Sequence, residues 1–229
     1  MNNIKNSSRI NLINKAVDKA LKHVVFDGWT DQTFKKVCLE LALTEDVGRQ
    51  LFPRGGVDMA IAFHERDDDR FLKDFLTSDL NKNTLRTRDR IEAAISARIE
   101  IAAINKESVK RSIALLTTPF YFSDGTKALW NSADKIWISI GDKSNDLNWY
   151  SKRLILSSIY SAVMIFWIED NSEHFLETKD FIKRRITDVM AIERVKANLK
   201  KSFIWEAASK KIDIAVADIK QRKNYFPGW

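Results

Sequence analysis

Hydrophobic residues recur at a spacing of three and four along almost the whole chain. In residues 10–26, Ile13, Val17 and Val24 share one face with Ala20 and Leu21. Residues three and four apart lie on the same side of an α-helix, so this stretch is predicted to form an amphipathic helix. The same pattern predicts helices that open at Thr30 and Val47 and helices over residues 57–76, 85–104, 127–140, 149–168, 175–200 and 204–222, with a short one ending at Pro119.

Residues that break helices are scarce in this chain. Its 229 residues include 7 glycines and 3 prolines. A sheet protein needs many tight turns rich in these residues, whereas a helical protein needs few. We therefore predict an all-α fold of about nine or ten helices. The predicted division is a helix-turn-helix head at 1–55, a larger helical ligand-binding body at 56–200 and a basic amphipathic C-terminal helix at 201–229.

The head resembles the DNA-binding head of TetR-type regulators. Residues 30–54 contain a capped helix, a tight turn, a second short helix and the step LFPRGG before a longer helix. The second short helix, however, opens with Glu45 and Asp46, and only Arg49 and Arg54 oppose them. Phosphates and base edges favour positive or neutral donors, so we do not expect DNA to be a partner. A ligand-responsive TetR-type transcription regulator remains the alternative.

Catalytic and metal-binding patterns are absent from the sequence. His23, His64 and His174 lie far apart, and Cys38 is the single cysteine. No Glu-x-x-His repeat, zinc-binding pair or phosphate-binding glycine loop is present. We therefore predict no metal, no cofactor and no enzymatic activity. A lipid-modifying enzyme is a weaker alternative because no nucleophile or acid-base pair stands out.

Two groups of aromatic residues leave alternatives open. The loop 141–150 joins two apolar helices and ends in Trp149 and Tyr150, which either form an exposed interface or cap the core.

The apolar run 154–168 is shorter than the ~20 residues of a membrane span and is predicted to be a buried central helix. The body is richer in large flexible side chains than close packing requires, which indicates either an aromatic core or an apolar ligand cavity. The candidate lining is Leu115, Leu116, Phe120, Trp130, Tyr160, Met164 and Trp167.

The C-terminal segment carries an apolar stripe with basic flanks. The formal net charge is +7, and residues 192–229 contain nine basic and four acidic residues. An amphipathic helix of this kind is typical of segments that lie on an anionic membrane, although a packed final helix remains the alternative. The predicted membrane-binding residues are Phe203, Ile204, Ala208, Ile212, Val216 and Ile219.

Two stretches carry a resemblance to a known family. They read GDKSNDLNWYSKRLILSSIYSA, at residues 141–162, and FIKRRITDVM, at residues 181–190. Together they resemble the ubiquinone (coenzyme Q) biosynthesis accessory proteins, lipid-binding proteins with a TetR-like fold. The resemblance covers about residues 10–200, and its most specific part is the string Asp-x-Asn-Trp-Tyr-x-x-Arg.

The resemblance implies a function and a set of partners. It implies a non-enzymatic homodimer that binds an isoprenoid quinone precursor or phospholipid and presents the precursor to the demethoxyubiquinone hydroxylase at an anionic membrane surface. The implied partner-binding residues are Asp134, Asp146, Trp149 and Tyr150, with Arg153 supporting the turn. No mitochondrial presequence is recognisable, so we expect a bacterial member, cytoplasmic and peripheral at the inner membrane.

Overall fold

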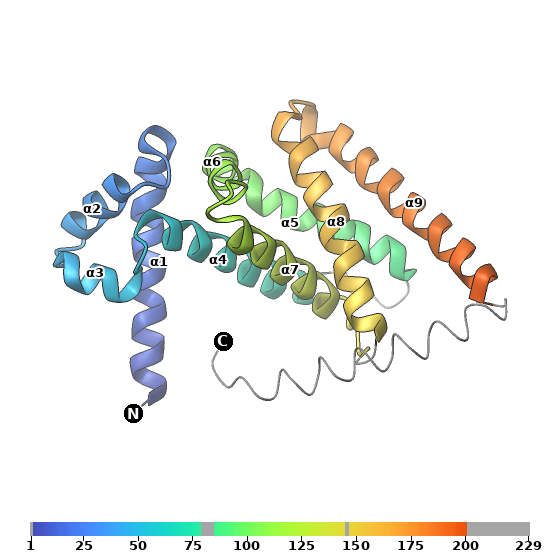
Figure 1. Ribbon diagram of the computed structural model, residues 1–229, viewed down its shortest axis with the longest axis horizontal. Coiled ribbons are helices and arrows are strands. Elements are labelled where there is room, and N and C mark those ends of the chain that lie inside the picture. Colours follow the sequence, from blue (N-terminus) through green and yellow to red (C-terminus); the bar gives the residue numbers. More distant parts are fainter. Residues whose placement is uncertain (1, 79–84, 145–146, 201–229) are drawn as a thin grey trace.

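The computed structural model describes residues 2–78, 85–144 and 147–200, and the side chains of all of these except 2–7 and 192–200 (Figure 1). Nine α-helices and one short 3-10 helix occupy the described residues. No strand is present among them, so the predicted all-α class is confirmed. Figure 1 shows α1 to α3 grouped at one end and α8 and α9 towards the other, with α4 running from the head along α7.

Three helices form the head: α1 (Asn2–Asp27), α2 (Asp31–Glu40) and α3 (Glu45–Leu51). Thr30 and Thr44 cap α2 and α3 by accepting hydrogen bonds from backbone N–H groups at the start of each helix. Buried Phe34 and Cys38 of α2 pack closely on Gly48 of α3, where an added Cβ would lie 2.5 Å from the Cys38 sulfur. Only glycine allows the two helices to approach this closely.

The helix α4 (Gly56–Thr77) joins the head to the body and contacts α1, α2, α5 and α7. It begins after Gly55, whose φ of +62° lies in the left-handed region. Trp29 stacks on Phe63 of α4 at 5.4 Å between ring centroids and donates its indole N–H to the Ser108 carbonyl at 3.0 Å. Aromatic packing and a buried hydrogen bond therefore fix the head on the body.

The body consists of α5 (Thr87–Ala103), α6 (Lys106–Leu116), α7 (Phe122–Ser139), α8 (Leu147–Glu169), η2 (Glu173–Phe175) and α9 (Leu176–Lys200). Within the body, α7 packs most extensively on α8, followed by α8 on α9, and α4 packs against this group through α7 and α5. Trp137 of α7 donates its indole N–H to the Lys152 carbonyl of α8 at 3.1 Å. These helices enclose the larger part of the hydrophobic core.

The helix α8 is buried on one face only. Leu156, Val163 and Trp167 are buried, whereas Leu154 and Ile165 are 65% and 64% exposed. The predicted buried central helix is therefore buried on its inner face, whereas its outer face is exposed. By length and composition alone, α8 is the one helix among the described residues that could span a bilayer. Its buried face packs on α7 and α9, as expected of a core helix in a helical bundle.

Candidate functional site

A cavity of about 260 Å³ lies among α4, α6, α7 and α8. Its walls are mostly apolar, with a few hydroxyl groups and one imidazole. The lining residues are His64, Ile113, Leu116, Thr117, Phe122, Gly125, Thr126, Ala128, Leu129, Ser132, Tyr160, Ser161, Met164 and Ile165. Apolar walls with a small number of polar groups are typical of small-molecule sites.

The cavity extends from the surface into the core. Its lining follows α7 from Phe122 to Ser132, which corresponds to ~15 Å at the α-helical rise. Phe122 is 63% exposed and Ile165 is 64% exposed, whereas Ser132 and Tyr160 are buried. One end of the cavity therefore meets solvent, and the other ends beside buried polar groups.

The buried end rests on an ion pair inside the protein. The Nε of Arg98 donates to the Asp68 carboxylate at 2.7 Å, and the two side chains are only 2% and 3% exposed. The Ser132 hydroxyl also donates to Asp68, at 2.8 Å to one of its two oxygens. The Nη1 atom of Arg98 is buried and has no hydrogen-bond partner. A buried donor without a partner is costly, so the ion pair behind this end is not fully satisfied by the protein.

His64 and Tyr160 are the titratable groups that line the cavity, and both are neutral at pH 7. Burial, assisted by the charge of Arg98, lowers the pKa of His64 to about 3. Burial raises the pKa of Tyr160 to about 12. The Ser112 hydroxyl donates to the Val109 carbonyl at 2.7 Å and lies 2.7 Å from the His64 Nε2. When the hydroxyl proton points to the Val109 carbonyl, Nε2 carries the imidazole proton and donates to Ser112 Oγ, which leaves Nδ1 as an acceptor.

The predicted lining residues separate into two groups. Leu116, Tyr160 and Met164 line the cavity. Leu115 instead packs against the core next to the cavity, because consecutive residues of a helix point in different directions and Leu116 faces the cavity. The other three predicted residues, Phe120, Trp130 and Trp167, also lie outside the lining.

Each of those three has a different environment. Phe120 is 87% exposed, since it lies in the link between α6 and α7. Trp167 is fully buried, with its ring 6.0 Å from Phe175 and the Lys106 ammonium 5.3 Å above it. Trp130 packs against the rings of Trp149 and Tyr150 at the N-terminal end of α8. Helical periodicity identified apolar faces but not which of them adjoin empty space.

Sequence reasoning missed His64 and Ser132, and it missed Asp68 and Arg98 behind them. In the sequence, Asp68 lies in a run of three aspartates, and Arg98 lies between Ile95 and Ile99 on the apolar face of its helix. The signal was the arginine itself, because a charged residue at a core position of a helix requires a buried partner. The sequence did not say which helix would supply that partner.

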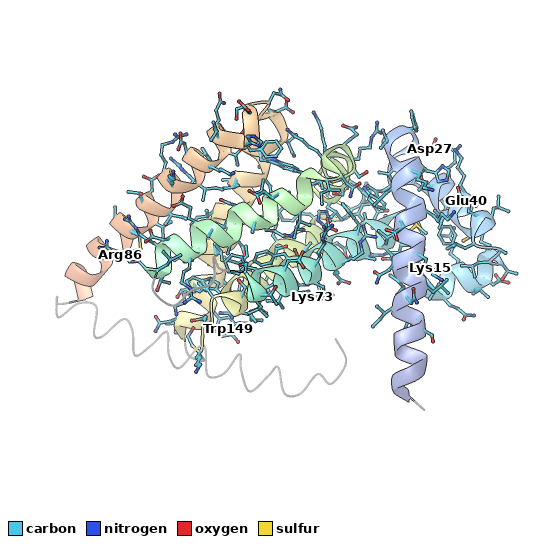
Figure 2. The ribbon with its side chains drawn as sticks, turned by 180° about the vertical axis from the view of Figure 1, so that it is seen from behind. Lys15, Asp27, Glu40, Lys73, Arg86 and Trp149 are labelled. Atoms are coloured by element: carbon cyan, nitrogen blue, oxygen red, sulfur yellow. The ribbon has the colours of Figure 1, made fainter. Side chains whose placement is uncertain are left out.

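Three aromatic rings form a cluster where the N-terminal end of α8 meets α7. Ring centroids are 5.9 Å apart for Trp130 and Trp149, 6.5 Å for Trp130 and Tyr150, and 4.8 Å for Trp149 and Tyr150. Figure 2 labels Trp149 at this end of the molecule. Trp149 and Tyr150 are each half-buried, so they are partly a cap on the core and partly accessible. We call Trp130, Trp149 and Tyr150 the aromatic patch.

Arg153 holds the aromatic patch in place from beneath. Its Nε donates to Asp134 at 2.5 Å and its Nη1 to Asp142 at 3.2 Å, while its guanidinium lies 4.0 Å from the centre of the Trp149 ring. Burial disfavours the charged form of Asp142, but hydrogen bonds from Lys152, Ser144 and Arg153 outweigh it and lower its pKa to about 2. Arg153 is 2% exposed, so it acts as a support. Asp146 lies outside the described residues.

Internal ion pairs engage both arginines that the alternative, a DNA-binding regulator, would use. Arg49 donates to Asp31 at 2.5 Å and to Glu45 at 3.2 Å. The Nε of Arg54 donates to Asp58 at 2.8 Å. Its Nη1 donates to Asp124 on α7 at 2.7 Å.

The predicted membrane-binding residues, Phe203 to Ile219, lie outside the described residues. Within the described chain, no three His, Cys, Asp or Glu side chains gather in a group that could hold a metal ion.

The COQ9 family model matches residues 122–193. This segment contains α7, α8 and most of α9, and so includes one wall of the cavity and the whole aromatic patch. The chain resembles the COQ9 proteins. The predicted resemblance to a ubiquinone biosynthesis family is thereby confirmed.

Curated COQ9 proteins match most of the chain. A probable ubiquinone biosynthesis protein, coq9, of Dictyostelium discoideum is 24% identical over 200 residues, which are 82% of this chain and 62% of that protein. Human COQ9 is 24% identical over 78% of this chain and 58% of its own length. The Schizosaccharomyces pombe protein is 28% identical over 77% and 69%. All three relatives are described as mitochondrial, and this chain spans about three-fifths of the length of the first two.

A solved structure shares the fold. The TetR transcriptional regulator from Nitrosomonas europaea ATCC 19718 aligns with a TM-score of 0.61 and 20% sequence identity, covering 77% of this chain and 97% of the regulator. The predicted TetR-like architecture is therefore confirmed. At this level of identity the match concerns the fold alone, because one fold hosts many functions.

Proposed function

We propose that this COQ9-like chain is a non-enzymatic accessory protein of ubiquinone biosynthesis. It binds an isoprenoid quinone precursor in the cavity among α4, α6, α7 and α8 and presents it to the demethoxyubiquinone hydroxylase at the membrane. The observation that carries the proposal is an apolar cavity that meets solvent between Phe122 and Ile165. The names of its relatives support the pathway.

An apolar cavity suits this task for a physical reason. Moving a polyprenyl chain from the bilayer into water costs a transfer free energy of about 0.8 kcal/mol for each methylene exposed. A carrier must therefore offer apolar walls as the lipid leaves the membrane. Ile113, Leu129 and Met164 supply such walls, and exposed Phe122 extends them to the surface.

The aromatic patch is the proposed surface for the hydroxylase. Tryptophan and tyrosine are enriched at the energetic centres of protein interfaces. Arg153, held by Asp134 and Asp142, fixes the orientation of Trp149. A ring fixed in advance loses little conformational entropy on binding, which favours affinity.

Replacing Trp149 by alanine tests the partner surface. We expect W149A to weaken capture of purified hydroxylase by tenfold or more, with lipid content largely unchanged. The matched control is F26A, because Phe26 is an aromatic residue of the head that is 83% exposed. Equal capture by W149A and the unchanged protein would exclude this surface. A collapsed thermal transition of W149A would instead assign Trp149 to the core.

The proposal includes membrane attachment through residues 203–219 and a homodimer. Basic residues near an anionic leaflet contribute about 1 kcal/mol each. We expect the full chain to sediment with phosphatidylserine vesicles and a chain ending at residue 200 to remain in solution.

The exposed side chain of Leu154 on the outer face of α8 is a candidate for the dimer contact. L154R should therefore lower the mass measured by light scattering to that of a monomer.

Lipid extraction tests the central part of the proposal. Mass spectrometry of the purified protein should find a co-purifying isoprenoid quinone or precursor. Ser161 lines the cavity, whereas Ser158 lies on the same helix and is exposed. S161W should therefore lose the lipid by filling the cavity, and S158W should keep it, with similar melting curves. An unchanged lipid content in S161W would contradict the proposed site.

The competing function is a DNA-binding regulator. It would require binding to duplex DNA that falls steeply with salt and depends on Arg49 and Arg54. Both guanidinium groups are engaged with carboxylates in the structure, so we expect no such binding. Gel-shift assays of the unchanged protein and R49A/R54A at two salt concentrations decide between the two functions.

A further inference from the structure

The polar groups at the buried end of the cavity have bonding capacity that the protein does not use. The Nδ1 of His64, which lines this end, remains an acceptor because Nε2 holds the imidazole proton. The Tyr160 hydroxyl keeps its proton and lines the same end. A hydrocarbon tail placed here would leave these groups without a hydrogen-bond partner, which is unfavourable for buried polar atoms. An oxygen atom of a ligand would satisfy them instead.

The size of the cavity limits what it can hold. Its volume of about 260 Å³ is below the ~300–1,000 Å³ typical of sites that enclose a drug-sized ligand. A polyprenyl quinone is larger than that, so only part of it fits. The part that matches a polar end followed by apolar walls is an oxygen-bearing ring with the first piece of its tail.

The position of the buried end also fits the proposed hand-over. Tyr160 lies ten residues along α8 from Tyr150 of the aromatic patch, about 15 Å at the helical rise, whereas Ile165 at the mouth lies about 23 Å away. Along α7, Ser132 is likewise nearer to Trp130 than Phe122 is. A ligand that enters ring first therefore has its ring on the side of the proposed partner surface and its tail at the mouth, beside the exposed apolar side chains of Phe122 and Ile165.

We propose that the buried end of the cavity is a binding site for a phenolic or quinonoid ring, which enters first and leaves its isoprenoid tail at the mouth between Phe122 and Ile165. The Tyr160 hydroxyl donates a hydrogen bond to a ring oxygen, and His64 Nδ1 accepts one from a ring hydroxyl. Ser132 and Arg98, tied together through Asp68, hold this end in shape. This inference rests on the proposed function, because it names the part of the lipid that the same cavity recognises.

Two probes that differ by one oxygen test the orientation. Geranylphenol and geranylbenzene share ring and tail, but only the first carries the ring hydroxyl. We expect the full chain to bind geranylphenol about fivefold or more tightly than geranylbenzene in calorimetric titrations, since one hydrogen bond contributes ~1 kcal/mol. In Tyr160→Phe, which removes one hydroxyl and keeps the ring, this preference should fall at least threefold.

The matched control lies at the other end of the cavity. Thr126 also lines it but is exposed beside the mouth, so Thr126→Val should leave the preference unchanged. A preference that depends on Thr126 and not on Tyr160 would mean that the tail enters first, which overturns the inference. Nuclear Overhauser contacts give a second measurement: ring protons should contact Tyr160, and tail methyls should contact Phe122.

Failure of the inference and failure of the proposed function give different results. Equal binding of the two probes in the unchanged protein overturns the ring site and leaves lipid binding intact. Absence of binding by both probes, together with absence of any co-purified lipid, overturns the proposed function and this inference with it.

Discussion

The head and the body use arginine in opposite ways. In the head, Arg49 and Arg54 lie at the surface and are held by neighbouring carboxylates. In the body, Arg98 is buried with Asp68 behind the cavity and keeps one nitrogen without a partner. The head thus resembles a DNA reader whose cations are already engaged, whereas the body places the polar side chains of His64 and Tyr160 in the wall of a cavity. Unused polar capacity next to a cavity, more than the fold itself, indicates where a ligand binds.

The largest expected effect comes from breaking the buried pair in the body. Asp68→Ala leaves Arg98 as an uncompensated charge and removes the acceptor of Ser132, so the free energy of unfolding should fall by ~3–5 kcal/mol. Urea denaturation followed by circular dichroism measures it. The control D68L/R98M replaces both charges with apolar groups and should recover most of the loss. A loss below ~1 kcal/mol would mean that water reaches the pair.

A smaller effect is expected from crowding the head. Gly48→Ala would place a Cβ 2.5 Å from the Cys38 sulfur and 2.9 Å from the Phe34 ring. Overpacking of this kind costs ~1–3 kcal/mol, measurable in the same denaturation experiment. Combined with Cys38→Ala, the cost of Gly48→Ala should shrink, since neighbouring substitutions are not additive. No cost in either background would show that the head repacks freely.

A pH-dependent effect separates Asp67 from its paired neighbour Asp68. Burial raises the pKa of Asp67 to about 6, so the folded protein binds this proton more tightly than the unfolded chain does. Stability contributed by the protonated form is lost as the pH rises from about 4 through about 6. Asp67→Asn should therefore raise the free energy of unfolding by ~1–2 kcal/mol at pH 7.5 and change it little at pH 4. An equal effect at both values would contradict the assignment.

The smallest effect is expected from the surface pair of the head. Asp31 is 51% exposed at its side chain and Arg49 33% exposed, so solvent screens their attraction. Asp31→Ala should lower the free energy of unfolding by less than ~1 kcal/mol, and 0.5 M salt should reduce the difference further. Thermal melts at two salt concentrations measure this. A loss as large as that of Asp68→Ala would remove the contrast between the two regions.

Most helices could be predicted because local chemistry specifies them. The capping role of Thr30 and the end of α1 near Gly28 follow from short-range hydrogen bonds and backbone freedom. The start of α7 was predicted at 127 but lies at Phe122. Gly125 hid this first turn, because glycine reads as a helix breaker. Here it lets α7 approach the Leu116 carbonyl, which an added Cβ would meet at 2.6 Å.

The sequence by itself determined the class of fold, the apolar face of most helices, the string around Trp149 that carries the family resemblance and the scarcity of basic residues opposite Glu45 and Asp46. Only the tertiary structure decided that Arg98 meets Asp68, that Trp130 joins the aromatic patch and that a cavity remains beside Tyr160 and Met164. Helical periodicity reports which residues avoid water. The space left between helices depends on how their side chains interlock, which no single helix encodes.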